Sequence, residues 1–376
     1  MSTSGPNPLR RTAAIGLASL LAIGIVIAVV ISSGATKSKP TVLVSGLSGS
    51  EKIPFLQDDR VEKRLRKLGL RLKVEAAGSR EIATAFDLSK YDFAFPAGVP
   101  AAQQIKLKYK PKFAPHSVFY TPMAIASFKP IASILIANGI AFKQGGTYYL
   151  DIKRYLDLVR RNVHWRELDH SAAYPVDKSV VVTSTDVRSS NSAAMYLSLA
   201  SYVANGDNTV QSSAEENQVL PIVTQLFLKQ GFVSSTSEEP FNDYLTIGVG
   251  KSPLVMIYEA QFVARAAAHD GSIRPDMLLL YPSPTVLSKH TFVPLTANGE
   301  RLGQALTSDP NLQELAVEYG FRTARPGAFQ RYTAGRGVRV PDTILNAVDP
   351  PSYETLEHMI GRIEKAYRAQ ESRTKR

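Results

Sequence analysis

Short loops rich in serine and glycine, placed directly after strand-like segments, are the residues of this sequence best suited to hold a solute. Ser48, Gly49 and Ser50 follow the apolar, β-branched run at 41–45. Open α/β sheets bind ligands beyond the carboxyl ends of their strands. Helix N-termini at that edge offer free N–H groups and a partial positive charge, which suits anionic or carbonyl groups. This loop therefore predicts ligand contacts.

A second loop of the same kind, residues 184–192, follows a strand-like run at 179–183 and opens a long helical segment. Its side chains are nearly all hydroxyls and amides. Ser and Asn are also preferred helix caps whatever the function of the protein, so capping is the alternative interpretation. The candidate ligand contacts here are Thr185, Ser189, Ser190, Asn191 and Ser192.

Three further loops end strand-like segments and add candidates. Ser79 follows the run at 70–76, and Pro96 and Gly98 follow the run at 91–95. Tyr258 and Glu259 follow the buried run at 253–257. A tyrosine ring stacks on a ligand and a carboxylate holds an amine or hydroxyl, but Glu259 is equally suited to cap the next helix.

Two segments resemble enzyme motifs, but neither motif is complete. The segment 250–252 (GKS) matches the end of a phosphate-binding P-loop, but Leu245 stands where the first glycine is required. The segment 46–50 (GLSGS) misses the nucleophile motif G-x-S-x-G because Ser50 replaces its last glycine. The six histidines are scattered without metal-ligand spacing. We expect no catalytic residue, no metal site and no cofactor.

The elements that must position these loops alternate between strand-like and helical segments, which is typical of an α/β fold. A chain of 376 residues with 44% hydrophobic residues is long enough for two cores. The net charge of +11 calls for a check on nucleic acid, but no recognition helix, RNA-binding signature or zinc motif supports it. A basic surface outside a cell would meet anionic wall polymers or lipid headgroups.

The N-terminal region contains a run without any charged residue from Thr12 to Thr36. As a helix it would reach roughly 37 Å, more than the ~30 Å hydrocarbon core of a bilayer. We interpret 12–36 as an uncleaved transmembrane signal-anchor, with 1–11 as a short cytoplasmic tail. A signal peptide cleaved near 33–35 is the alternative. The chain has no cysteine, hence neither a disulfide nor a lipoprotein anchor.

Taken in order, several segments resemble the type 2 periplasmic, or extracytoplasmic, solute-binding proteins that serve ABC importers. The resemblance implies a two-lobed α/β fold, here preceded by one transmembrane helix, that closes on a ligand. Residues 41–123 with 284–376 would form lobe one and 124–283 lobe two, and Tyr120, on the first crossing between them, would contact the ligand or pack the hinge. The segments that carry the resemblance are 45–52, 120–126, 183–196, 255–262, 280–284 and 303–321.

The function implied is capture of a small polar or anionic solute at a cell membrane, by a single-pass protein whose main domain is extracytoplasmic. Its partners would be the solute, an ABC permease or another membrane protein, and lipid around residues 12–36. The anchor departs from the family pattern, so a ligand-sensing or scaffold ectodomain is the first alternative. An extracellular hydrolase and a binder of wall polymer are weaker ones.

Overall fold

The computed structural model describes residues 40–231, 234–344 and 346–374. Residues 42–376 form one compact unit. The predicted tail 1–11 and signal-anchor 12–36 lie outside the described residues. Among the residues that are described, no helix combines the length and apolar character needed to cross a membrane.

The first lobe is built on a mixed sheet. Its parallel strands are β1 (Val42–Ser48), β2 (Leu70–Ala76) and β3 (Phe93–Phe95), with β1 in the middle. β2 alternates apolar and charged residues, as a half-exposed edge strand should, whereas all of β3 is buried. β9 (Thr285–Pro294) then runs antiparallel to β3.

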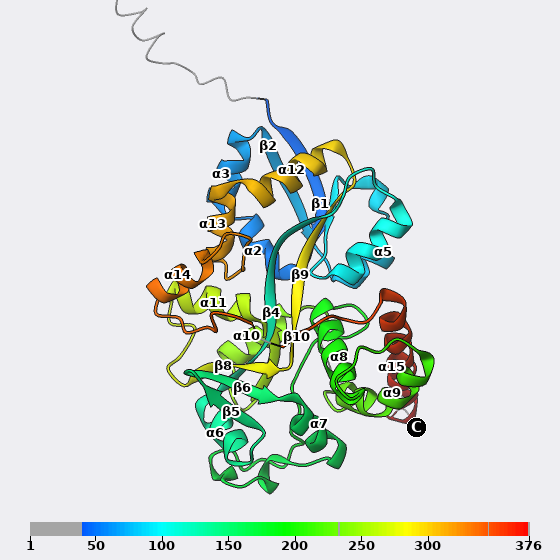
Figure 1. Cartoon of the computed structure of the whole chain (residues 1–376), viewed down its shortest axis with the longest axis vertical. Helices are drawn as coiled ribbons and strands as arrows, with labels where there is room; N and C mark the ends of the chain where they lie inside the picture. Colours follow the sequence, from blue (N-terminus) through cyan, green and yellow to red (C-terminus); the bar gives the residue numbers. More distant parts are fainter. Residues whose placement is uncertain (1–39, 232–233, 345, 375–376) are drawn as a thin grey trace, which may run out of the picture. The chain divides into compact units, whose positions relative to one another are not determined.

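Long strands connect the two lobes. β4 (His116–Phe128) pairs with β9 along its first half, from His116 to Pro122, and with other strands along its second half. The predicted crossing at 120–126 thus lies inside β4. The hydrogen-bonded path between strands is continuous, but it passes from one lobe to the other only through these strands (Figure 1).

The second lobe contains the remaining sheet. The second half of β4 lies between β7 (Leu254–Tyr258) and β8 (Met277–Ser283), antiparallel to both. The hairpin of β5 (Ala141–Gln144) and β6 (Thr147–Asp151) extends this sheet beside β8. The two-residue strand β10 (Ala347–Val348) pairs with the start of β9.

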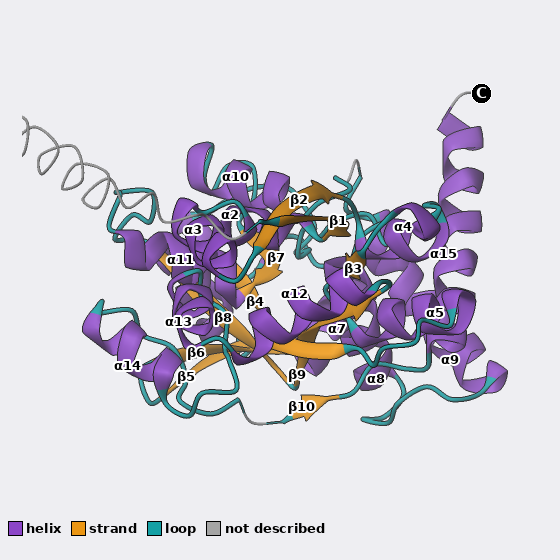
Figure 2. Ribbon diagram, turned by 90° about the horizontal axis from the view of Figure 1, so that it is seen from above, coloured by secondary structure: helices purple, strands orange, loops and turns teal. Residues whose placement is uncertain are grey.

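Helices lie on both sides of the strands (Figure 2). Those of the first lobe begin at recognisable signals: Asp58 caps α3 by accepting a hydrogen bond from the backbone N–H of Arg60, and Asp309 caps α13 in the same way. Helices with the first lobe are α2 (Ile53–Leu56), α3 (Asp59–Lys67), α4 (Ser79–Thr84), α5 (Val99–Tyr109), α12 (Ala297–Ser308), α13 (Pro310–Glu318) and α14 (Ala328–Gly335).

The second lobe holds the longest helices. α9 starts at a capping box in which Ser212 and Glu215 satisfy each other's backbone N–H groups. Helices here are α6 (Lys129–Ala137), α7 (Ile152–Arg161), α8 (Asn191–Ala204), α9 (Ser213–Leu228), α10 (Glu238–Thr246), α11 (Glu259–Ala268) and α15 (Tyr353–Thr374). Short 3-10 helices occur at Ser50–Lys52, Leu88–Lys90, Trp165–Glu167 and Ser171–Ala173.

Apolar side chains gather into separate cores. In the first lobe, neighbouring residues such as Phe93 and Ala94 belong to different clusters, because side chains of a strand alternate between its faces. The second lobe has one large cluster, which includes the single tryptophan, Trp165. Leu356 and Met359 of α15 join that cluster, although the predicted division placed all of 284–376 in lobe one.

Two sequence expectations about elements were wrong. Residues 179–183, predicted as a buried strand, form only isolated bridges, from Ser179 to His164 and from Thr183 to Val255. Residues 222–230, whose sequence pattern also predicts a helix, belong largely to α9, which begins earlier, at Ser213, because Pro221 is accommodated inside it. The first of these segments directly precedes the candidate loop 184–192, so that loop follows an isolated bridge and not a complete strand.

Candidate functional site

A small polar cavity lies between the lobes, where strands of both end. Its volume is about 10 Å³, room for one water molecule at most. Both serine loops predicted from the sequence reach it, one from each lobe. The lining residues are Gly49, Ser50, Glu51, Ala77, Gly78, Ser79, Ser190, Asn191, Ser235, Thr236, Ser237 and Tyr258.

The first-lobe wall is formed by three loops that are tied together. The backbone N–H of Gly49 donates to the carbonyl of Phe95 at 3.2 Å, which joins the loop after β1 to the end of β3. The hydroxyl of Ser79 accepts the N–H of Ala97 at 2.8 Å, which joins the loop after β2 to the same segment. Ser48, fully buried, contacts the carbonyl of Gly49. These bonds hold the loops in place before any solute arrives.

The second-lobe wall is a chain of hydroxyls at the start of α8. The hydroxyl of Ser192 contacts those of Thr185 at 2.7 Å and Ser190 at 3.0 Å, and all three residues are buried. The amide of Asn191 donates to the hydroxyl of Tyr258 at 3.1 Å. It also lies 3.4 Å from the hydroxyl of Ser288, on β9. Asn191 therefore connects the second lobe to the crossing strand.

The lobes touch each other at two glycines of the first lobe. A Cβ atom on Gly98 would lie 2.3 Å from Oδ1 of Asn191, and one on Gly78 would lie 2.4 Å from the carbonyl oxygen of Ser189. Both distances are far below ordinary contact. The structure is thus in a closed arrangement, and glycine is required at these points for the lobes to approach so closely.

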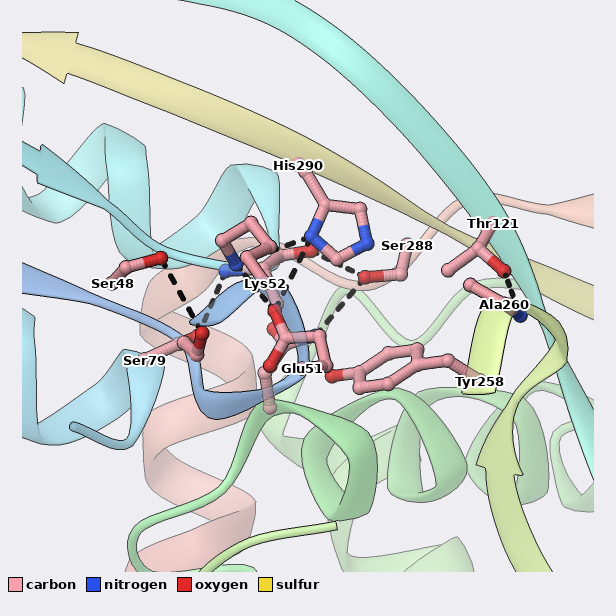
Figure 3. A network of polar contacts seen from close by, with 12 residues as sticks. Ser48, Glu51, Lys52, Ser79, Thr121, Tyr258, Ala260, Ser288 and His290 are labelled. Atoms are coloured by element: carbon pink, nitrogen blue, oxygen red, sulfur yellow. Dashed lines mark hydrogen bonds and ion pairs between the residues drawn. The ribbon is translucent and has the colours of Figure 1, made fainter. Parts of the chain in front are cut away.

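A buried ionic cluster lies against the first-lobe wall (Figure 3). Glu51 and Lys52 form an ion pair, and their charged groups contact Nδ1 of His290 at 3.4 Å and 3.3 Å, respectively. Lys52 and His290 are fully buried. The Lys52 ammonium also lies 4.8 Å from the centre of the Phe95 ring.

These groups have shifted pKa values. Burial alone would raise the pKa of Glu51, but Lys52 and His290 outweigh it and lower that pKa to about 2. Burial, reinforced by the charge of Lys52, lowers the pKa of His290 to about 4. At neutral pH the cluster therefore holds a carboxylate and a neutral imidazole, and burial lowers the pKa of Lys52 against the opposing charge of Glu51.

Burial also raises the pKa of Tyr258 well above its ordinary value, and the Glu51 carboxylate adds to this effect. Its hydroxyl is therefore protonated and remains a hydrogen-bond donor at any physiological pH.

His290 has one nitrogen without a partner. Among the described residues, no hydrogen-bond partner lies near its Nε2. Its Nδ1 lies between the Nζ of Lys52, which donates, and the carboxylate of Glu51, which accepts.

Two predicted site residues do not reach the cavity. Tyr120 pairs with Arg322 through two backbone hydrogen bonds of 2.9 Å and lies at the crossing strand. Both carboxylate oxygens of Glu259 are occupied: Arg322 donates to them at 2.7 and 2.9 Å, and the hydroxyl of Tyr281 donates at 2.6 Å. Since Glu259 and Arg322 are both buried, this network is a strut between the crossing segments, not a ligand wall.

The remaining predicted residues lie at the cavity or directly behind it. Ser48, Ser192 and Thr185 support the lining, and Ser189 contributes a backbone carbonyl at the lobe contact. The carbonyl of Pro96 accepts the N–H of Thr291 on β9 at 3.3 Å. Sequence reasoning missed Glu51, Lys52, Ser288 and His290. Glu51 and Lys52 directly follow the first serine loop, so the same strand-end rule could have included them. It missed 235–237 as well, a serine-rich segment before α10.

Two long helices begin at this place without a side-chain cap. α5 starts after Gly98 and α8 after Ser190, and neither first turn receives a hydrogen bond from the side chain of its capping residue. Their first N–H groups and partial positive charges are directed to the region where the lobes meet. Among the described residues, no group of three or more His, Asp or Glu side chains could hold a metal ion.

Comparisons with known proteins identify the fold. No protein-family model matches the sequence, and neither does any curated protein. The sulfate-binding protein SubI from Mycobacterium tuberculosis H37Rv has a similar structure, with a TM-score of 0.50 at 12% identity over 80% of this chain and 93% of that one. Iron-bound HitA from Pseudomonas aeruginosa matches with a TM-score of 0.52 at 10% identity, over 86% of this chain and 99% of that one.

A solved protein described as a two-component system protein that mediates signal transduction matches with a TM-score of 0.54 at 14% identity, over 85% of this chain and 100% of that one. At these identities the similarity concerns the fold alone. The resemblance stated from the sequence is confirmed at that level: the chain has the two-lobed α/β fold of type 2 periplasmic solute-binding proteins.

Proposed function

We propose that this protein is an extracytoplasmic solute-binding protein that captures a small polar or anionic solute between its lobes for ABC-type uptake. The observation that carries the proposal is the convergence of polar loops from both lobes on one cavity. Ser50 and Ser79 line it from the first lobe, and Ser190 and Asn191 from the second. A solute held by both sets would be stabilised only in the closed arrangement.

The size of the cavity supports a mechanism in which the lobes part and close again. A volume of about 10 Å³ excludes any solute larger than water. Opening at the contacts of Gly78 and Gly98 would expose the first turns of α5 and α8. Hinge motion would be taken up where β4 and β8–β9 cross, with the Glu259–Arg322 strut preserved.

The charge of the solute follows from which groups it would meet. The uncapped helix starts favour an oxyanion or carbonyl group. The Glu51 carboxylate, already paired with Lys52, favours a group that donates hydrogen bonds. A polar neutral solute and an anion with a protonated oxygen both fit this wall, so we define the class as polar or anionic.

We further propose that 12–36 anchors the protein as a single-pass membrane protein, with 1–11 in the cytoplasm and the main domain outside. The lobe division 41–123 with 284–376, and 124–283, is part of this proposal, with α15 assigned to the second lobe by its packing. The partners proposed are an ABC permease or another membrane protein, and lipid around 12–36, without nucleic acid. Protease protection of the full chain in sealed vesicles tests the orientation.

The experiment for solute capture is a thermal-shift screen of the full chain. The panel contains sulfate, molybdate, phosphate, amino acids, short peptides and sugars. A true ligand should raise the melting temperature in proportion to the logarithm of its concentration once saturated. Removal of one hydroxyl that lines the cavity, in Ser50→Ala or Ser190→Ala, should weaken binding of that ligand roughly 2- to 13-fold, because such a hydrogen bond contributes about 0.5–1.5 kcal/mol.

Ser308→Ala is the matched control, because Ser308 is an exposed serine on α12 that contacts only its own helix. It should bind the ligand as the parent does. A hit whose affinity is the same in all four proteins would place binding elsewhere and refute the site.

A ligand-sensing or scaffold ectodomain is the second candidate, favoured by the proposed anchor, which would keep the protein beside a membrane partner. Neighbouring genes for a permease and an ATPase would argue for uptake, and their absence for sensing. A hydrolase is the least supported candidate. Turnover on ester, peptide or glycoside substrates that disappears in Ser50→Ala would establish it instead.

A further inference from the structure

A large cavity lies apart from the site between the lobes. Its volume is about 820 Å³, within the range of roughly 300–1,000 Å³ typical of small-molecule sites. It lies among α11, β8, the turn between β5 and β6, and the segment 336–339 after α14. It shares no lining residue with the interlobe cavity. We call it the basic basin.

The floor of the basic basin is apolar. Phe262 of α11 and Met277, Leu279 and Tyr281 of β8 line it, and all four side chains are buried. Phe262 and Ala266 lie on one face of α11 because they are four residues apart, and His269 follows the end of the helix. The floor therefore offers aromatic and aliphatic contact to a planar molecule.

The rim of the basin is positively charged. Among its lining residues are five lysines and arginines and no aspartate or glutamate: Lys129, Lys143, Arg265, Arg336 and Arg339. All five are exposed. Nearby carboxylates are already engaged, Asp270 with Arg265 at 3.6 Å and Asp276 with Arg274 at 3.7 Å.

Most of the rim cations have no carboxylate partner. Within the described ranges, Arg265 is the only one of the five that forms an ion pair. Lys143 and Arg336 instead lie over the rings of Tyr148 and Tyr332, at 4.9 Å and 5.6 Å. Cations of one sign around a low-dielectric floor raise the local concentration of anions.

We propose that the basic basin binds a small organic anion that carries an aromatic or other apolar body. The floor supplies contact with the body, and the rim supplies charge around it. The ligand must have both features. An inorganic ion would leave the apolar floor in contact with water, and a neutral hydrocarbon would leave the cations of the rim unpaired.

The test uses three probes of matched shape or charge, titrated calorimetrically into the full chain in a nonionic detergent. Naphthalene-1-sulfonate has both features, its neutral analogue naphthalene-1-sulfonamide has only the ring system, and methanesulfonate has only the charge. Titrations into micelles alone are subtracted. We expect saturable binding of the sulfonate, with the other two probes weaker by at least fivefold.

Variants locate the site. In Lys143→Gln/Arg339→Gln both changes fall on exposed residues with no ion pair, so the fold should be retained, and the melting temperature checks this. The sulfonate should bind at least fivefold more weakly. Lys63→Gln/Lys67→Gln, which removes the same charge from the exposed face of α3, should bind it as the parent does.

Three results would overturn the proposal: no saturable binding of the sulfonate, equal weakening in both double variants, or equally tight binding of either control probe. None of these results concerns the interlobe cavity, so they test the basic basin independently of the proposed solute capture.

Discussion

Gly98→Ala is the sharpest test of lobe closure, because the closed arrangement leaves no space for one methyl group. The new Cβ would lie 2.3 Å from Oδ1 of Asn191, whereas ordinary contact begins at 3.4 Å. The lobes must therefore part by about 1.1 Å, or Asn191 must leave its place beside Tyr258. Gly98 has an ordinary extended backbone, so alanine introduces no backbone strain there.

The expected magnitude follows from the cost of overpacking. Forcing a methyl group into a filled contact costs about 1–3 kcal/mol. Because the open arrangement avoids this cost, the ratio of closed to open molecules should fall by roughly 5- to 150-fold. Apparent affinity for any solute that requires closure should fall by the same factor.

A measurement of the distance between the lobes detects the change in the ratio of closed to open molecules directly. The natural chain has no cysteine, so two introduced cysteines can be labelled without removing any native one. Lys108→Cys in α5 and Lys153→Cys in α7 are exposed positions on different lobes. Electron-electron double resonance on the spin-labelled full chain should show a shift to longer distances in Gly98→Ala.

Two controls separate closure from other effects. Gly250→Ala adds a methyl group where nothing lies within 4 Å, and its distances should match those of the parent. Gly98→Ala/Asn191→Ala removes the atoms that the new methyl would meet, and it should recover the shorter distances. Unchanged distances in Gly98→Ala would mean that the side chain of Asn191 has turned away from the new methyl group. Unchanged distances in Gly78→Ala as well, where the methyl group would meet the backbone carbonyl of Ser189, would refute the closed contact.

Three further predictions concern stability. Arg322→Gln should lower the free energy of unfolding by about 3–5 kcal/mol, because it leaves the buried Glu259 carboxylate without its partner, and Glu259→Gln/Arg322→Gln should recover part of the loss; denaturant titration measures both. His290 takes up a proton near pH 6.5 when unfolded but only near pH 4 when folded. The unfolded state therefore binds more protons in that window, and stability should fall as the pH drops from 6.5 to 4, by up to roughly 3 kcal/mol. Melting curves of His290→Gln should depend less on pH across this window, and an unchanged profile would contradict the assignment. Asp309→Ala removes the cap of α13 together with the partner of Arg64, and it should cost about 1–2 kcal/mol by chemical denaturation; a loss below 0.5 kcal/mol would count against the cap.

Local patterns were sufficient to predict much of the fold. β2 has the predicted bounds because alternation of apolar and charged residues in LRLKVEA is unambiguous. The spacing of the buried residues Val61 and Leu65 is likewise typical of the amphipathic helix that α3 forms. Residues 179–183 have the same β-branched composition as a strand, yet they form only isolated bridges. Composition alone does not determine which segments find a partner along their whole length.

The candidate site was predictable to the extent that strand ends determine it. Ser50 and Ser190 come from loops more than a hundred residues apart, and both face one cavity. Ser50 follows β1, as the strand-end rule requires, whereas the segment before Ser190 is joined to β7 only by the isolated bridge of Thr183. Glu259 satisfied the same rule but is turned away by Arg322, a residue of a distant segment that no local pattern links to it. His290 looked isolated in sequence because its partners, Glu51 and Lys52, lie at the other end of the first lobe's chain.

The near absence of free volume between the lobes has a kinetic consequence. Because a molecule in this arrangement cannot admit a solute, association must wait for spontaneous opening. The observed association rate should therefore rise with solute concentration only until it equals the opening rate, and then level off. Rapid mixing would display this plateau, whose height reports how often Gly78 and Gly98 separate from α8 and the loop before it.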